Sequence, residues 1–156
     1  MVTITSESNH RFVLLGIGNE LRGDDGVGPY IADNLQNPCW QAINCGTVPE
    51  NFTGQIKELS PAVLVVVDAA KMGLSPGEYR VLPMEHRDTM ITSTHSIPLT
   101  VTLSYLQEYV GQTMLLGVEP EEINNSTDLS PKVKLAAQEI IELLEESRFD
   151  SIDILD

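Results

Sequence analysis

Residues 13–28 constrain the fold more than any other part of this chain. The stretch begins with an apolar run, continues through a loop with four glycines and two adjacent aspartates, and ends in an apolar pattern of helical period. This order predicts a buried strand, a tight turn and a helix. Because open α/β sheets bind ligands at the carboxyl ends of their strands, Asp24 and Asp25 in the loop become candidate functional residues.

Three interpretations of this loop compete. Gly16-x-Gly18 suggests a dinucleotide-binding motif, but position 21 is Leu where a third glycine is needed, and two carboxylates would face the pyrophosphate. A second interpretation makes Asp24 or Asp25 the cap of the following helix, which accounts for one aspartate better than for two. The third is a metal or acid/base site, which requires partner residues elsewhere in the chain.

The composition narrows the class of protein. A chain of 156 residues is long enough for one domain with a sizeable core. Its net charge of −14 disfavours binding to a nucleic-acid backbone, which requires basic patches. There is no stretch of transmembrane length, and residues 1–10 lack the basic and apolar regions of a signal peptide, so we expect a cytoplasmic protein. Cys39 and Cys45 form no CxxC pair, and we expect reduced, structural thiols.

The rest of the chain alternates between strand and helix patterns. Strands are expected at residues 12–15, 41–45, 62–67, 78–82 and 114–118, and helices over residues 27–35, 51–59, 96–110 and 131–144. This order predicts an α/β three-layer sandwich with a mostly parallel five-stranded sheet and helices on both faces. The connection before residues 78–82 is too short for a crossover helix, so this strand is expected to run antiparallel to its predecessor, at an edge.

The chain is expected to form one domain. Residues 1–10 are interpreted as a polar tail, residues 11–148 as a single α/β domain, and residues 149–156 as an acidic C-terminal tail. Because that last segment lies beyond the final apolar period, we expect it to bury little and to be dispensable.

Ser96 is a plausible cap for the helix that begins near Pro98.

Two further residues are candidates for the site. Asp68 ends the most hydrophobic strand, where an unpaired carboxylate is costly, and His95 precedes a helix. With Asp25 they would provide two carboxylates and an imidazole, a reasonable ligand set for a divalent transition metal. A triad of Ser93 or Ser96 with His95 and Asp68 lacks a nucleophile elbow, and a Cys45 nucleophile lacks an identifiable base.

The motifs around these residues resemble one known family. Gly16-x-Gly18-Asn19-x-Leu21-x-x-Asp24-Asp25-x-x-Gly28, Val67-Asp68-Ala69, and Thr94-His95 followed by Pro98-Leu99 are similar to three motifs of the endopeptidases that mature nickel-iron hydrogenases. They occur in the family's order and at the expected ends of elements. Residues 72–78 and the Pro-Leu pair look most like the branch that serves the formate-hydrogenlyase-type hydrogenase.

The resemblance implies an activity. Such endopeptidases, often classed as aspartic-type, remove the C-terminal extension of the hydrogenase large-subunit precursor after nickel insertion. The family's metal-binding residues correspond here to Asp25, Asp68 and His95, and Asp24 matches an acidic position expected to support the loop. The nickel is supplied by the substrate, and no organic cofactor, nucleic acid or membrane is implied. A non-catalytic nickel-handling protein that binds the precursor, and a nucleotide-binding domain, are the alternatives.

Overall fold

The computed structural model describes residues 11–83, 90–91 and 97–156. Within them the strands are β1 (Phe12–Ile17), β2 (Trp40–Gly46), β3 (Val63–Ala69), β4 (Tyr79–Val81) and β5 (Gln112–Val118). The α-helices are α2 (Val27–Asn34), α3 (Thr53–Leu59), α5 (Leu99–Leu106) and α6 (Pro131–Glu145). Short 3-10 turns lie at η1 (Gly23–Gly26), η2 (Pro49–Phe52), η4 (Gln107–Tyr109) and η5 (Phe149–Ser151).

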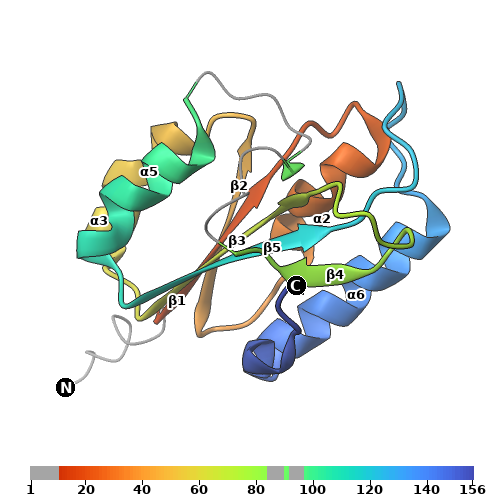
Figure 1. The fold of residues 1–156 in the computed structure, drawn as a ribbon. Helices are drawn as coiled ribbons and strands as arrows, with labels where there is room; N and C mark the ends of the chain where they lie inside the picture. The colour runs from red at the N-terminus through yellow and green to blue at the C-terminus, as the bar shows by residue number, and fades with distance from the viewer. Residues whose placement is uncertain (1–10, 84–89, 92–96) are drawn as a thin grey trace.

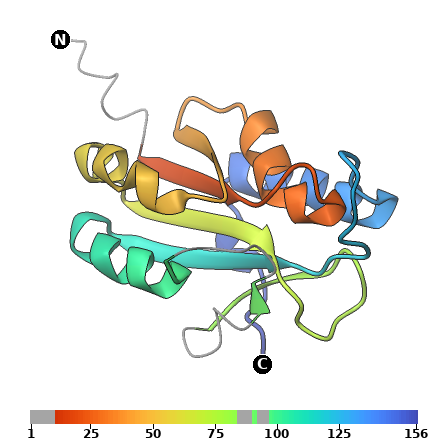
Figure 2. The same cartoon turned by 90° about the horizontal axis from the view of Figure 1, so that it is seen from above.

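The strands form one sheet in the order β2-β1-β3-β5-β4, in which β4 alone is antiparallel to its neighbour. Helices α3 and α5 cover one face and α2 and α6 the other (Figures 1 and 2). The central strand β3 is buried throughout: Val65 and Val67 face the α2 and α6 side, and Leu64 and Val66 face the α3 and α5 side. The predicted three-layer sandwich is confirmed.

Two local expectations need refinement. The antiparallel edge strand is confirmed, but its neighbour is β5, because β5 lies between it and β3. Helix α5 begins at Leu99, after Pro98 at the cap position, and no side chain caps it. A residue that precedes proline is disfavoured in helical conformation, which explains a start beyond Ile97. The expected cap, Ser96, lies outside the described residues.

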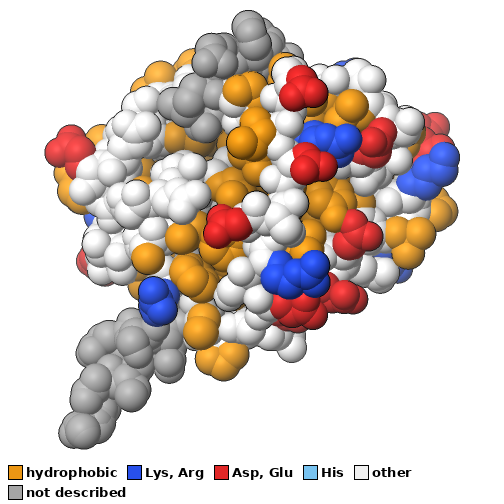
Figure 3. Space-filling model, turned by 60° about the horizontal axis from the view of Figure 1, so that its bottom comes forward, with side chains coloured by type: hydrophobic (Ala, Val, Ile, Leu, Met, Phe, Trp, Pro, Cys, Tyr) orange, Lys and Arg blue, Asp and Glu red, His pale blue; other side chains and the backbone are white. Residues whose placement is uncertain are grey.

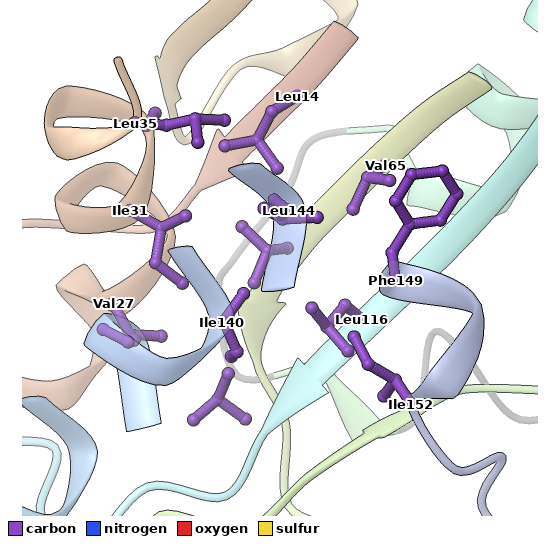
Figure 4. Packing of buried hydrophobic residues seen from close by; sticks show 14 of the residues in the cluster. Leu14, Val27, Ile31, Leu35, Val65, Leu116, Ile140, Leu144, Phe149 and Ile152 are labelled. Carbon is purple, nitrogen blue, oxygen red and sulfur yellow. The ribbon is translucent and has the colours of Figure 1, made fainter. Parts of the chain in front are cut away.

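The C-terminal segment corrects a prediction. Residues 149–156 were expected to bury little, yet Phe149 and Ile152 are buried in the core on the α6 side of the sheet (Figure 4). The backbone N–H of Val81 donates to the Asp153 carbonyl oxygen at 2.8 Å, and that of Leu155 donates to the Val81 carbonyl oxygen at 2.9 Å. The segment therefore packs along the outer edge of β4 and is part of the fold.

Acidic residues outnumber basic ones in this chain, with 23 Asp and Glu against 9 Lys and Arg. Red acidic side chains lie beside blue basic ones on the face shown in Figure 3. Among the described residues, the buried carboxylates are confined to Asp24, Asp25, Asp68 and Glu119. Of the helices that the structure describes, none is long and apolar enough to cross a membrane. These four buried carboxylates therefore differ from the chain's other described Asp and Glu residues, which are at least partly exposed.

Candidate active site

The four buried carboxylates gather at one end of the sheet. Asp24 and Asp25 lie in η1 after β1, Asp68 is the penultimate residue of β3, and Glu119 follows β5. These three strands are parallel neighbours, so their carboxyl ends meet at the same edge. Burying a carboxylate costs free energy unless hydrogen bonds or a partner charge compensate, so four at one edge mark a specialised region.

Glycines allow the loop after β1 to approach the sheet. A Cβ at Gly28 would lie 2.4 Å from the Ile17 carbonyl oxygen and 2.6 Å from that of Val67, so the first turn of α2 packs directly on the backbones of β1 and β3. Gly18 has a φ of 147°, and a Cβ there would lie 1.9 Å from the Asp25 carbonyl oxygen. This close approach carries Asp25 to the end of the sheet, and η1 contacts β3.

Asp25 and Asp68 are both fully buried, with 0% of their surface exposed. The backbone N–H of Asn19 donates to Asp25 Oδ2 at 2.9 Å, and the backbone N–H of Ala69 donates to Asp68 Oδ1 at 2.8 Å. In β1 and β3, Gly16 lies opposite Val67, the residue before Asp68. Asp25 therefore lies in the loop after β1 and Asp68 at the end of β3, and these two strands are parallel neighbours. The sequence predicted that both residues lie at one end of the sheet, but it did not predict the strand order.

Asp24 has a different role from its neighbour. Its carboxylate accepts hydrogen bonds from the backbone N–H groups of Glu121 at 2.8 Å, Glu122 at 2.9 Å and Ser130 at 2.8 Å. The Ser130 hydroxyl donates a fourth at 2.8 Å. Asp24 thus ties η1 to the loop between β5 and α6. The helix-cap interpretation is wrong for both aspartates, because neither η1 nor α2 has a side-chain cap.

Glu119 was not predicted from the sequence as a site residue. Its Oε1 accepts the backbone N–H groups of Met72 at 2.7 Å and Leu74 at 3.1 Å, so it fixes the loop that follows β3. A signal was present: Glu119 follows the apolar run of β5 directly, just as Asp68 follows the apolar run of β3. The same rule of a carboxylate at the end of a buried strand would have found it.

His95 lies outside the described residues, as do Ser93 and Ser96, so the structure does not place the third candidate ligand or the alternative triad. Ile91 forms an antiparallel bridge with Ala70, just beyond the end of β3. In the parts of the chain with assigned positions, no three His, Cys, Asp or Glu side chains are arranged to hold a metal ion.

Cys45 is not suited to act as a nucleophile. Its side chain is buried beneath α3 and α5, and its thiol contacts the Ile43 carbonyl oxygen. Burial, with a smaller contribution from the Glu50 carboxylate, raises the pKa of the Cys45 thiol to about 12. Because the thiolate is the reactive species, this cysteine is inert near neutral pH and serves the core.

Comparisons with known proteins agree on one family. Residues 27–147 match the family model described as hydrogenase maturation protease. The Hydrogenase 3 maturation protease of Escherichia coli K12 is 35% identical over 137 residues, covering 85% of this chain and 88% of the relative.

Solved structures give the same result. The solution structure of the endopeptidase HycI from Escherichia coli superposes with a TM-score of 0.83 at 33% identity, covering 93% of this chain and 96% of that one. The crystal structure of the [NiFe] hydrogenase maturation protease HycI from Thermococcus kodakarensis has a TM-score of 0.76 at 30% identity, covering 94% and 99%.

Proposed function

Since this chain belongs to the hydrogenase maturation protease family, we propose that it cuts the precursor of a nickel-iron hydrogenase large subunit. Its relatives are proteases and endopeptidases, so the chain is an enzyme that hydrolyses peptide bonds. In this proposal the enzyme removes the C-terminal extension after nickel has been inserted. A nickel-handling protein without catalysis is disfavoured by the same family membership.

The observation that carries the proposal is the burial of two carboxylates at neighbouring strand ends. Asp25 and Asp68 are fully enclosed, on elements that contact one another, and neither serves as a helix cap. A fold has no need for a carboxylate at the end of its central strand, and such groups concentrate at functional sites. We therefore assign Asp25 and Asp68 to the recognition of the substrate-bound nickel.

His95 completes the proposed set. Ile91 is anchored beside the end of β3 through its bridge to Ala70. The four residues of chain from Ile91 to His95 span at most about 14 Å, so covalent geometry allows an imidazole to reach the same sheet end. Two carboxylates and an imidazole suit a borderline divalent metal such as nickel.

The proposed chemistry uses the nickel as part of the substrate. The precursor presents its own metal, and Asp25, Asp68 and His95 add ligands that fix the precursor's position. A scissile bond held in this way reacts from a fixed orientation, and a nearby cation also polarises the carbonyl group that water attacks. Hydrolysis adds water across the bond: the hydroxyl joins the new C-terminus and the proton joins the released amine.

Single substitutions of the three residues test this assignment. Asp25→Asn and Asp68→Asn preserve shape while removing charge, and His95→Ala removes the imidazole. Each is expected to fold and to lower the rate of precursor cleavage at least about a hundredfold, since the loss of one ligand spoils a sparse metal site. Double substitutions should be barely slower than single ones, because residues that act as a unit are non-additive.

Two control variants match these changes. Glu119→Gln alters a buried carboxylate at the same sheet edge and keeps the oxygen that accepts from Met72 and Leu74, so cleavage should persist. His86→Ala changes a histidine with no assigned role. Melting temperature and cleavage are measured on the same preparations. Folded and fully active Asp25→Asn and His95→Ala proteins would refute the assignment.

A further inference from the structure

Leu21 is exposed although it lies in a hydrogen-bonded turn of the candidate site. The residue is 66% exposed, but the turn that carries it is fixed by three hydrogen bonds. The backbone N–H of Leu21 donates to Asn19 Oδ1 at 2.9 Å, and that of Arg22 to the Asn19 carbonyl oxygen at 3.1 Å. The backbone N–H of Asn19 itself donates to Asp25 Oδ2 at 2.9 Å. The turn therefore holds an apolar side chain in solvent, on a loop that is hydrogen-bonded to Asp25, which is assigned to nickel recognition.

A cavity of about 540 Å³ lies beside this side chain. We call it the Leu21 groove, and its lining residues are Gly18, Asn19, Glu20, Leu21, Gly46, Thr47 and Thr127. The volume falls in the range of ligand-binding pockets. Two of the lining residues are glycines and two are threonines, so the walls leave room for a polypeptide backbone. Asn19, which lines the groove, donates a hydrogen bond from its backbone N–H to Asp25 Oδ2.

Another cavity among the described residues lies in a different place. It measures about 560 Å³ and is formed between β4, α6 and the C-terminal segment. Because β4 and β2 are at opposite edges of the sheet, that cavity is on the far side from β2 and the Leu21 groove. Of the two, the Leu21 groove is the one that shares a hydrogen-bonded loop with Asp25. A polypeptide whose nickel is recognised by Asp25 therefore has an adjoining surface in the Leu21 groove.

We propose that the Leu21 groove binds the stretch of the precursor next to the scissile bond, and that Leu21 packs against an apolar side chain of that stretch. The inference rests on the proposed function, because it takes the precursor as the occupant. Single exposed leucines are common on protein surfaces, so exposure alone carries no weight. Three observations support the proposal instead: the hydrogen-bonded turn, the adjoining cavity, and the hydrogen bond from the Asn19 backbone N–H to Asp25. Leu21 is then a specificity-determining residue.

Substitution of Leu21 tests the inference. Steady-state cleavage of purified nickel-loaded precursor is measured for the wild type, Leu21→Ala, Leu21→Asp and Leu21→Met. The KM of Leu21→Ala should rise about tenfold with kcat within about twofold, since a half-buried contact loses a few methylene groups. Leu21→Asp should raise KM further, and Leu21→Met should remain close to wild type. Melting temperatures should not change, because the side chain is exposed.

Leu135 provides a matched control. It is also 66% exposed, but it lies on α6 and does not line the groove, so Leu135→Ala should leave KM unchanged. The dissociation constant of each variant for the precursor is measured as well, which requires no cleavage. Equal affinity for the wild type and Leu21→Ala overturns this inference, as does an equal loss in Leu135→Ala. A wild type that binds but never cuts the nickel-loaded precursor refutes the proposed function instead.

Discussion

Phe149→Ala should destabilise the protein strongly, although Phe149 is the eighth residue from the C-terminus and lies in an acidic segment. The Phe149 ring contacts Phe12 and Trp40 edge-on, with ring centroids 5.7 Å and 5.9 Å apart. Truncating a buried phenylalanine to alanine costs about 3–5 kcal/mol of unfolding free energy. Because the chain end can partly collapse into the space, we expect the lower end of that range, about 3 kcal/mol.

This loss is measurable in two ways. For a chain of this length it lowers the melting temperature by about 6–12 °C. With a denaturant slope of about 2 kcal/mol per molar urea, it lowers the urea midpoint by about 1.5 M. Trp40 is the only tryptophan in the chain, so its fluorescence reports on the contact directly.

The neighbouring Ile154→Ala variant is the control. Ile154 is 65% exposed, so its truncation should change the unfolding free energy by less than about 0.5 kcal/mol. Deletion after Ser147 removes Phe149 and Ile152 together and should be more damaging than Phe149→Ala. A Phe149→Ala protein that unfolds at the wild-type urea concentration would show that the segment does not pack as described.

Three further predictions concern the site loop. Gly18→Ala should abolish cleavage while leaving a folded protein, since its Cβ would lie 1.9 Å from the Asp25 carbonyl oxygen; circular dichroism and a cleavage assay check this. Asp24→Asn should cost about 1–3 kcal/mol in urea unfolding, because an amide cannot accept all the bonds that the Asp24 carboxylate takes from Ser130 and the loop before it. Cys45→Ala should retain cleavage, because burial raises the pKa of this thiol and keeps it unreactive. A folded but inactive Cys45→Ala variant would instead indicate that the thiol acts as the nucleophile.

The layers of the fold could be predicted because their signals are local. The apolar run in β3 and the helical stripe in α6 each carry their own periodicity, and the structure buries those residues as expected. The packing of Phe149 and Ile152 had no such signal, since two apolar residues in an acidic segment form no period. Their burial depends on the groove between β4 and α6, which exists only after folding.

The site could be predicted in part for the same reason. Asp25 and Asp68 follow recognisable strands, so their place at the sheet end was accessible from the sequence. The different roles of Asp24 and Asp25 could not be predicted from the sequence, because the backbone groups that donate hydrogen bonds to Asp24 belong to residues about a hundred positions later in the chain. The position of Leu21 was visible in the motif, but its exposure was not, since an apolar residue is ordinarily expected in a core.

The most direct test of recognition through the nickel compares nickel-loaded and nickel-free precursor as substrates. The purified protein is incubated with each form, and the products are weighed by mass spectrometry, with casein as a general protease substrate. Recognition through the metal predicts one cut near the C-terminus of the nickel-loaded precursor, no cut in the nickel-free form, and intact casein. Cleavage of the nickel-free precursor at the same rate would contradict recognition through the metal.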